Sequence, residues 1–456
     1  MNVTAVFDIG KTNKKFFLFD EHLNEVHRSY VHLEEGSDDD GYACENLEQL
    51  TAWMLETFRE AQAMPEFEIT HLNFSTYGAS FVHLDEQDRP VTPLYNYLKP
   101  FPDNLYESFF EKYGPADDWS AATASPDMGM LNSGLQLYWL KHVKPEAFSR
   151  IRRSLHFPQY CSFLFTGKHT NEYTSIGCHT GLWDFTKHDY HRWVYEEKIN
   201  QLFPAVQPTT STVETAINGK KVKVGAGIHD SSAALLPYII SNEQPFLLIS
   251  TGTWSITLNP FCRDELSVRD LQRDCLNYMR TDGLPVRASR LFLGNEYKIW
   301  VRKLADHFRQ SYERHRNVEP DPAVLKKLAR FENPVYRWES IRMPGSGKTA
   351  SPGTDLGIFS SYEEAYHQLI RELADLQVSS LYLAKGAGSA TKVYIDGGFI
   401  DNRLFIQLLS DRLQGFELIT TEAPLGSALG AAIAVHNRTE LTGALSGSSL
   451  LQKTKA

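Results

Sequence analysis

A single aspartate near the middle of the chain has the surroundings of a general base. Asp230 lies in the run Gly227-Ile228-His229-Asp230-Ser231-Ser232-Ala233-Ala234, between the strand-like residues 222–224 and an apolar stretch that begins at Ala233. This pattern predicts a turn at the mouth of a helix, where a carboxylate at the edge of a cleft can accept a proton from a bound hydroxyl group. Aspartate is also a common helix N-cap, so a purely structural role is the competing interpretation.

A second group of candidate residues lies near the N-terminus. Residues 3–7 and 16–19 are short apolar runs, and Asp8-Ile9-Gly10-Lys11-Thr12-Asn13-Lys14-Lys15 lies between them. We predict a β-hairpin with a tip rich in hydroxyl groups and cations. Gly10 allows close approach of the backbone, so successive N–H groups of the tip can bind an anion. Asp8 can hold a hydrated Mg²⁺, and an ordinary polar turn is the alternative.

The same pattern recurs in the second half of the chain. Residues 246–258 form an apolar strand, a small hydroxyl-rich turn at Thr251-Gly252-Thr253 and a second strand. Aligning Gly252 with Gly10 places the two hairpins on one another. We interpret them as the beginnings of two similar halves, whose tips bind the phosphates of one nucleotide between two domains.

A third motif is a strand, residues 392–399, that ends in Gly397-Gly398 and precedes a predicted helix at 402–413. Adjacent glycines at a strand end leave room for a flat ligand such as adenine. Gly345-Ser346-Gly347-Lys348-Thr349 looks superficially like a P-loop. We reject that interpretation, because the motif requires glycine at position 342 and Arg342 stands there.

The elements that must position these residues alternate between strands and helices. Apolar spacing predicts helices at 47–61, 135–140, 147–151 and 365–383, and strands at 69–74 and 81–84. Such alternation is typical of α/β proteins. The small residues of 423–433 predict a helix that another helix approaches closely at Gly426 and Gly430. We expect surface loops at 37–40 and 171–175 and a frayed tail at 446–456.

Composition excludes several classes of function. A chain of 456 residues is long enough for two or three domains, and a net charge of −10 argues against a nucleic-acid-binding surface. The five cysteines form no C-x-x-C pair, which disfavours a zinc site or a disulfide framework and favours a cytoplasmic protein. We also expect neither a signal peptide nor a membrane span.

Taken in order, these motifs resemble the FGGY family of carbohydrate kinases, within the actin-like ATPase superfamily, over almost the whole chain. Asp8-Ile9-Gly10-Lys11-Thr12-Asn13 and Ser250-Thr251-Gly252-Thr253 look like the two phosphate motifs. Asp396-Gly397-Gly398-Phe399 with Asn402 looks like the adenosine motif, and His229-Asp230 matches the motif that carries the catalytic aspartate. The resemblance implies two ribonuclease-H-like α/β domains, 1–238 and 239–456, with a nucleotide and sugar cleft between them.

The resemblance also assigns roles to individual residues. It implies ATP and Mg²⁺ as cofactors, a small sugar as the acceptor, Asp230 as the catalytic base and Asp8 as a ligand of Mg²⁺ through water. Nucleotide binding is implied for Asp8, Gly10, Lys11, Thr12, Asn13, Lys15, Thr251, Gly252, Thr253, Gly397, Gly398 and Asn402. Sugar binding is implied for Thr76, Tyr77, Gly78, His229 and Asp230.

Within the family, the chain is most similar to the rhamnulokinase branch, through Asn171-Glu172-Tyr173-Thr174 and Gly252-Thr253-Trp254-Ser255 among others. It departs from the family pattern at Asn13, Ser80, Lys99 and Phe101, the last two standing where an acidic and a basic sugar contact are usual. We therefore expect a ketose acceptor, L-rhamnulose or a similar deoxy-ketose such as L-fuculose.

Several alternatives stay open. They are a kinase for xylulose, ribulose or glycerol, a chaperone-type ATPase, and a catalytically silent sugar sensor. A chaperone would carry a peptide-binding domain after the ATPase core, and a sensor would lack the base that Asp230 provides. The resemblance also leaves room for a homodimer.

Overall fold

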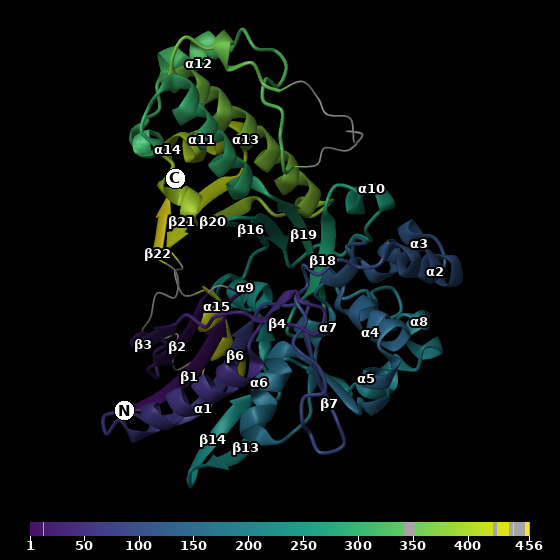
Figure 1. Ribbon diagram of the computed structural model, residues 1–456. Helices are drawn as coiled ribbons and strands as arrows, with labels where there is room; N and C mark the ends of the chain where they lie inside the picture. The colour runs from purple at the N-terminus through teal and green to yellow at the C-terminus, as the bar shows by residue number, and fades with distance from the viewer. Residues whose placement is uncertain (12, 342–352, 423–425, 437–440, 442–451, 456) are drawn as a thin grey trace.

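Two seven-stranded β-sheets form the centres of two lobes in the computed structural model (Figure 1). The structure describes residues 1–11, 13–341, 353–422, 426–436, 441 and 452–455. Thr12, the rejected P-loop at 345–349 and the first residues of the predicted small-residue helix, 423–425, lie outside the described residues. The two-lobed α/β architecture agrees with the predicted fold class.

The first sheet is built around the N-terminal strand. Its strands, from one edge to the other, are β13 (Thr212–Ile217), β14 (Lys220–Gly225), β6 (Glu68–Thr76), β1 (Asn2–Ile9), β2 (Lys14–Phe19) and β3 (Glu25–Val31), with β15 (Ile228–His229) paired to β6. β1 is antiparallel to β2 and parallel to β6, so Asp8 lies opposite Lys15 on one side and Ser75 on the other. β15 places His229 opposite Thr76. The predicted hairpin, the segment after β6 and the Asp230 turn therefore meet at the sheet edge formed by the carboxyl ends of the parallel strands β1, β6 and β15.

The second sheet repeats this arrangement. Its order is β18 (Cys275–Met279), β19 (Pro285–Leu291), β17 (Ser255–Asn259), β16 (Phe246–Thr251), β20 (Lys392–Gly397), β21 (Glu417–Glu422) and β22 (Gln452–Lys455). β16 is antiparallel to β17 and parallel to β20, as β1 is to β2 and β6. The two hairpins predicted from sequence are thus confirmed as corresponding parts of two similar sheets.

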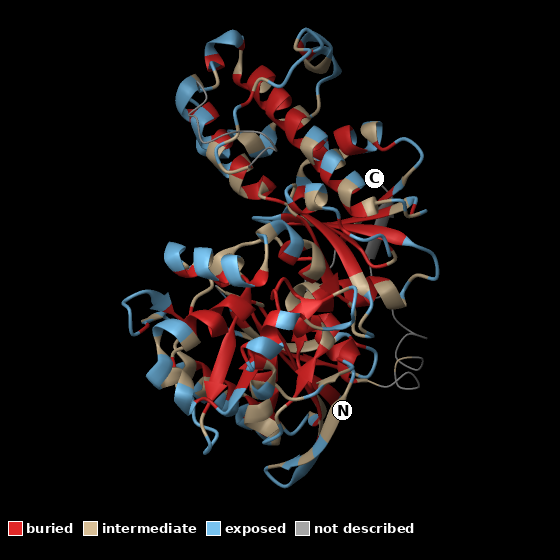
Figure 2. Cartoon of the chain, turned by 90° about the vertical axis from the view of Figure 1, so that its right-hand side faces the viewer, coloured by how far each residue is buried: buried red, intermediate tan, exposed pale blue. Residues whose placement is uncertain are grey.

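Helices cover both sheets. In chain order they are α1 (Leu47–Ala63), α2 (Asp103–Tyr113), α3 (Ala116–Thr123), α4 (Ser133–Val143), α5 (Pro145–Arg150), α6 (Phe157–Thr166), α7 (Tyr173–Ile176), α8 (Arg192–Glu196), α9 (Asp230–Ile240), α10 (Val268–Leu271), α11 (Leu293–Phe308), α12 (Pro322–Leu328), α13 (Tyr362–Lys385), α14 (Arg403–Arg412) and α15 (Gly426–Val435). Figure 2 shows buried strands beneath helices whose outer faces are exposed. The helices expected from apolar spacing are confirmed, with boundaries shifted by a few residues.

Short strands and turns complete the lobes. The remaining strands are β4 (Gly36–Ser37), β5 (Ala43–Cys44), β7 (Phe81–Leu84), β8 (Arg153–His156), β9 (Asn171–Glu172), β10 (Trp183–Asp184), β11 (Asp189–Tyr190) and β12 (Val206–Gln207). One apolar core joins α1 and α6 to the first sheet, and another joins α11, α13 and α14 to the second.

The last helix returns to the first lobe. α15 packs against α9 and against the first sheet, where Asn73 donates a 2.8 Å hydrogen bond to the carbonyl oxygen of Ala431 (Figure 1). A Cβ atom on Gly430 would lie 1.8 Å from the carbonyl oxygen of Ala233, so only glycine permits this approach. The close helix contact predicted at Gly430 is confirmed. The domain division between 238 and 239, which falls within α9, stays a prediction.

Three local expectations are wrong. The tail is not frayed at 452–455, where β22 pairs with β21, and the rest of the segment 446–456 lies outside the described residues. Residues 171–175 are not a surface loop, since the Glu172 side chain is buried where it accepts hydrogen bonds from the backbone N–H groups of Thr174 and Ser175. Residues 37–40 are not wholly solvated either, because Asp38 is buried in an ion pair.

Candidate active site

Asp230 is the first residue of α9, and His229 precedes it as the N-cap residue. The turn before them depends on Gly227, which has φ +85° and where a Cβ atom would lie 2.5 Å from the Pro158 carbonyl oxygen. Asp230 Oδ1 accepts a 2.6 Å hydrogen bond from the N–H of Ser231, while 37% of the side chain stays exposed. The carboxylate thus satisfies one free amide of the helix and still reaches solvent.

His229 is buried beside Asp230. Its Nε2 lies 3.0 Å from Cys178 Sγ and 3.4 Å from Asp230 Oδ1. The His229 main-chain N–H donates a 3.0 Å hydrogen bond to Thr174 Oγ1. A Cβ atom on Gly78 would lie 2.8 Å from the imidazole ring, so glycine at position 78 makes room for it. The structure therefore brings the predicted residues Gly78, His229 and Asp230 together.

The other two predicted sugar-binding residues follow β6 to its end. Thr76 is fully buried and donates a hydrogen bond to the carbonyl oxygen of Tyr77, which leaves its hydroxyl engaged with its own chain. The Tyr77 ring lies 6.2 Å from the ring of Tyr97, and its hydroxyl donates to Glu45. Burial and the negative charge of Asp230 both raise the pKa of Tyr97.

Tyr97 was not among the residues predicted to form the site. It is half-buried and close enough to Asp230 to sense its charge. The signal that could have found it is its position in Tyr95-Asn96-Tyr97, directly before the places where the chain departs from the family pattern.

Asp8 lies at the same sheet edge and is only 7% exposed. Its Oδ2 is 3.7 Å from Lys15 Nζ, and its Oδ1 accepts a 2.9 Å hydrogen bond from Ser427 Oγ of α15. Burial raises the pKa of Asp8 against the opposing effects of Lys15 and Ser427, and the charge of Asp230 raises it further. Asp8 therefore places a buried carboxylate at the same sheet edge as Asp230, and carboxylate oxygens are the donors that a hydrated Mg²⁺ prefers.

The tip of the first hairpin is a tight turn. The N–H of Gly10 donates a 3.0 Å hydrogen bond to the carbonyl oxygen of Asn13, whose side chain is exposed. Lys11 Nζ lies 2.6 Å from Glu35 Oε1. The Gly10 amide is therefore used to close the turn, and the Lys11 ammonium group is held in an ion pair with Glu35.

The second tip differs from the first in how its threonines are used. Thr251 is buried, accepts a 3.1 Å hydrogen bond from the N–H of Phe399 and donates one of 2.5 Å to the carbonyl oxygen of Asp396. Gly252 closes the turn through its N–H, which donates to the Trp254 carbonyl oxygen, and both Gly252 and Thr253 are exposed. Thr251 thus ties β16 to β20, whereas Gly252 and Thr253 face solvent.

A hollow of about 600 Å³ lies where the adenosine motif was predicted. Gly398 and Asn402 line it together with Tyr297, Tyr366 and Arg403, which sequence reasoning had not identified. Asn402 donates a 2.9 Å hydrogen bond to the Tyr366 hydroxyl and accepts one from the N–H of Phe405 as the N-cap of α14. These contacts fix the amide at the wall of the hollow.

The two glycines at the end of β20 are not equivalent. Gly397 has φ +85°, and a Cβ atom there would lie 1.8 Å from the carbonyl oxygen of Thr251. A Cβ atom on Gly398 would meet no atom within 4 Å. Gly397 is therefore required by the backbone, and Gly398 is the glycine that keeps space open for a ligand.

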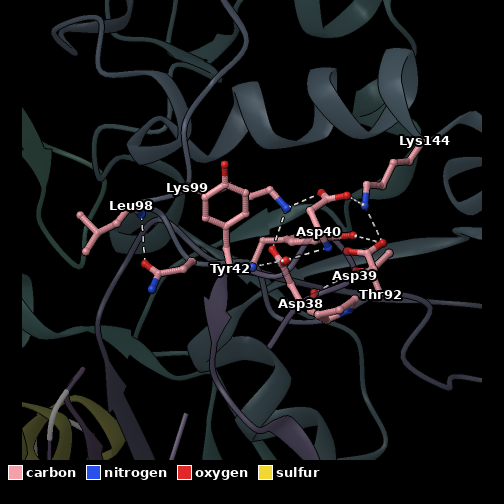
Figure 3. Close-up of polar contacts among 11 residues, drawn as sticks. Asp38, Asp39, Asp40, Tyr42, Thr92, Leu98, Lys99 and Lys144 are labelled. Carbon is pink, nitrogen blue, oxygen red and sulfur yellow. Dashed lines mark hydrogen bonds and ion pairs between the residues drawn. The ribbon is translucent and has the colours of Figure 1, made fainter. Parts of the chain in front are cut away.

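Figure 3 shows that Lys99 is held in a cluster of ion pairs. Its ammonium group lies 2.6 Å from Asp38 and 2.5 Å from Asp40, and its side chain is only 4% exposed. The rings of Tyr95 and Trp139 each lie 4.8 Å from it. Within the described part of the chain, Asp38, Asp39 and Asp40 are the only group of three or more His, Cys, Asp or Glu side chains with metal-ligand spacing, and lysine ammonium groups pair with them.

The other departures and a second hollow lie nearby. Ser80 is buried, with 2% of its surface exposed, and Phe101 packs against the backbone at Gly129. A hollow of about 650 Å³ is lined by both lobes, for example by Met128 and by Arg290, but the predicted site residues that the structure describes are not part of its wall.

None of the described helices combines the length and apolar character needed to cross a bilayer.

Comparison with known proteins agrees with this arrangement. The chain is 24% identical to a rhamnulokinase of Halalkalibacterium halodurans, over 89% of this chain and 85% of that protein. It is 23% identical to a gluconokinase of Bacillus subtilis, over 93% of this chain and 85% of that one.

Solved structures share the fold. A carbohydrate kinase from Novosphingobium aromaticivorans superimposes with a TM-score of 0.77 at 21% identity, covering 99% of this chain and 93% of that one. A ligand-bound xylulose kinase from Lactobacillus acidophilus gives 0.78 at 16% identity, covering 100% and 93%.

Family models match both lobes. The model of the N-terminal domain of the FGGY family of carbohydrate kinases matches residues 3–236, and that of the FGGY C-terminal domain matches residues 243–335. The chain therefore belongs to the FGGY family of carbohydrate kinases and is an ATP-dependent sugar phosphotransferase.

Proposed function

We propose that this kinase transfers the γ-phosphoryl group of ATP to a primary hydroxyl group of a ketose, with L-rhamnulose or L-fuculose as the favoured acceptor. One observation carries the proposal. Asp230, a half-exposed carboxylate, lies at the same sheet edge as His229, Gly78 and the buried Asp8. A hydroxyl group bound there would contact Asp230 as its proton acceptor, close to Asp8, which we assign to the cation that neutralises the phosphates.

In the proposed reaction, Asp230 accepts the proton of the sugar hydroxyl group, and the hydroxyl oxygen forms a bond to the γ-phosphorus of ATP. The bond from that phosphorus to the β–γ bridging oxygen breaks, and ADP leaves. Phosphoryl transfer depends mainly on positioning and on stabilisation of charge. A bound Mg²⁺ would neutralise phosphate charge, and Asp8 would hold it through water. The buried Asp8, oriented by Ser427 and Lys15, fits that role.

The nucleotide would extend from the two hairpin tips to the second lobe. We assign its phosphates to Gly10, Lys11, Thr12 and Asn13 on one side and to Gly252 and Thr253 on the other. Gly10 and Gly252 would allow close approach of the backbone, because their own N–H groups close the turns. Its adenine would occupy the hollow beside Gly398 and Asn402. Thr251 and Gly397 would act by shaping the backbone of the tip and of the strand end. The Thr251 hydroxyl group is hydrogen-bonded to the Asp396 carbonyl oxygen, and Gly397 packs against the Thr251 carbonyl oxygen.

The acceptor assignment rests on the wall of the sugar site and on the names of relatives. His229 lies 3.4 Å from Asp230, the charge of Asp230 raises the pKa of Tyr97, and the Tyr97 ring lies 6.2 Å from that of Tyr77. This aromatic surface suits the apolar face and methyl group of a deoxy-ketose. Rhamnulokinases from Halalkalibacterium halodurans and Oceanobacillus iheyensis are among the similar proteins, at 24% and 25% identity. An L-fuculokinase of Haemophilus influenzae matches over 57% of this chain.

A coupled ADP-release assay with Mg-ATP tests the proposal. The panel contains L-rhamnulose, L-fuculose, xylulose, ribulose, gluconate and glycerol. We expect the highest kcat/KM with one of the two deoxy-ketoses. Highest turnover with gluconate or glycerol would overturn the acceptor assignment, and ADP release unaffected by every sugar would overturn the kinase mechanism.

We further propose a cytoplasmic protein with domains at residues 1–238 and 239–456. Light scattering coupled to size-exclusion chromatography decides between a monomer and the homodimer that the resemblance leaves open.

A further inference from the structure

A buried ion pair lies between the two binding regions of the first lobe. Lys14 Nζ is 2.9 Å from Oε1 of Glu45 and 3.1 Å from Oε2, and the two side chains are 2% and 1% exposed. Lys14 begins β2, and alternation along the strand turns it to the face opposite Lys15, which faces Asp8. The mechanism proposed above uses neither Lys14 nor Glu45.

On one side, the ion pair contacts the first hairpin tip. Lys14 Nζ donates a 3.1 Å hydrogen bond to the carbonyl oxygen of Lys11. Lys11 lies within the turn that the Gly10 amide closes. The orientation of that peptide group therefore depends on where the Lys14 ammonium is held.

On the other side, the ion pair contacts the sugar-binding residues. The Tyr77 hydroxyl donates a 3.1 Å hydrogen bond to Oε2 of Glu45, the oxygen that also accepts from Lys14. Glu45 forms a backbone bridge with Leu94, a few residues before Tyr97. Glu45 thus links three parts of the site: its carboxylate contacts Tyr77 and the lysine that supports the phosphate tip, and its backbone pairs with the segment that leads to Tyr97.

The energetics of such a pair make its position well defined. A charged group taken out of water is costly unless it is paired and hydrogen-bonded, so Lys14 and Glu45 hold each other in one arrangement. Replacing both charges with neutral residues of similar size is often harmless to stability, whereas removing one is not. Stability alone therefore does not explain why both charges lie here.

We propose that Lys14 and Glu45 are positioning residues that couple nucleotide binding to acceptor binding. A phosphate group bound at the tip would fix the Lys11 carbonyl group, and through it the positions of Lys14, Glu45 and the Tyr77 ring. Acceptor binding against Tyr77 would act in the reverse direction with the same free energy, as linkage requires. This inference rests on the proposed function of the site.

The test measures coupling rather than activity. Isothermal titration calorimetry gives the Kd of the ketose with the highest turnover in the panel, with and without Mg²⁺ and the non-hydrolysable analogue AMP-PNP. For the wild type we expect at least a fivefold tighter Kd with the analogue, the lower end of common coupling factors. The double variant Lys14→Met/Glu45→Gln retains an acceptor for the Tyr77 hydroxyl but loses the contact with the Lys11 carbonyl. The coupling ratio is the Kd of the ketose without the analogue divided by the Kd with it. For the double variant we expect this ratio to fall to within twofold of one.

Two further variants separate positioning from folding. Lys14→Met alone should lower the Tm, and the double variant should recover most of that loss without recovering the coupling. Glu197→Gln is the matched control, because Glu197 is a buried carboxylate held by Lys112 and Lys141, away from the tip and Tyr77. It should lower the Tm and leave the coupling ratio unchanged.

The outcomes are distinct. A wild-type ratio of one, or a double variant that keeps the wild-type ratio, overturns the coupling role while leaving the kinase proposal intact. If the double variant recovered both the wild-type coupling ratio and the Tm that Lys14→Met loses, the ion pair would have a structural role only. Failure of the kinase proposal itself is seen earlier, as ADP release that no sugar of the panel stimulates.

Discussion

The hydroxyl group of Ser427 donates a 2.9 Å hydrogen bond to Oδ1 of Asp8, between residues 419 positions apart in the sequence. Ser427 lies in the first turn of α15, which returns from the second lobe to pack on the first sheet. The last described helix therefore orients the carboxylate that we assign to Mg²⁺, and this relationship gives the first prediction.

Ser427→Ala should weaken the dependence on Mg²⁺ without unfolding the protein. Loss of a group that orients a metal ligand typically costs 10–100-fold in affinity, and a contact through water belongs near the lower end. We expect about a tenfold rise in the Mg²⁺ concentration for half-maximal activity. Ser379→Ala, on the exposed face of α13, is the control. An unchanged Mg²⁺ titration would remove Asp8 from the metal site.

Asp230→Asn separates the base from a structural residue of the helix start. Loss of a proton acceptor typically costs ~10²–10⁴ in rate, while asparagine serves at helix starts about as well as aspartate. We expect kcat to collapse while the Tm and both ligand affinities stay within a few-fold of the wild type. Asp321→Asn, at the N-cap of α12, should leave kcat unchanged. Near-normal turnover in Asp230→Asn would exclude the proposed mechanism.

Gly398→Val tests the adenine hollow, and Gly397→Val provides the contrast. A side chain at 398 enters open space, so we expect at least a tenfold higher KM for ATP, an acceptor KM within twofold and little change in Tm. At 397 the same change meets the Thr251 carbonyl oxygen and a positive φ, which should lower the Tm and all activity. If Gly398→Val raised both KM values equally, the hollow would not be the nucleotide site.

Buried histidines should make the free energy of unfolding fall in mild acid. Burial lowers the pKa of His83, His156 and His179 to about 3 each and that of His191 to about 4. The unfolded chain binds a proton at each near pH 6.5, whereas the folded protein does not until about pH 3 to 4. Stability is therefore full above about pH 6.5 and decreases as the pH falls through this window, by roughly 1.4 kcal/mol per pH unit for each group.

Urea unfolding at pH 7, 6 and 5 measures this slope. His156→Phe, which keeps the ring contact with Phe81, should reduce the slope by up to about a quarter, the share of one group among the four histidines whose pKa lies near 3 or 4. His22→Gln, at an exposed position, should leave it unchanged. Equal slopes in the wild type and His156→Phe would show that His156 is protonated in the folded state over this range.

The sequence determined the features that depend on neighbouring residues. Apolar alternation and turn residues specify the hairpins at Gly10 and Gly252, because strands joined by a short turn pair locally. Apolar periodicity likewise specified α1 and α13. The order of the motifs was enough to indicate the family, and with it the candidate base Asp230.

Tertiary structure decided which distant residues meet. Parallel pairing of β1 with β6 and of β15 with β6 brings Asp8, Thr76 and His229 to one edge, and no local pattern specifies that register. Charged residues illustrate the limit most clearly. Lys99 stands where the family has a sugar contact, yet Asp38, some sixty positions earlier, holds it in the interior.

The same reason explains what the sequence missed at the site. Glu45, Tyr97 and Ser427 have no motif of their own, and each acquires its role only through a partner that folding brings near. Whether a polar side chain lies in water or in a buried ion pair depends on what packs over it. That choice is made by the whole fold, because the cost of burying a charge is offset only when its partner arrives.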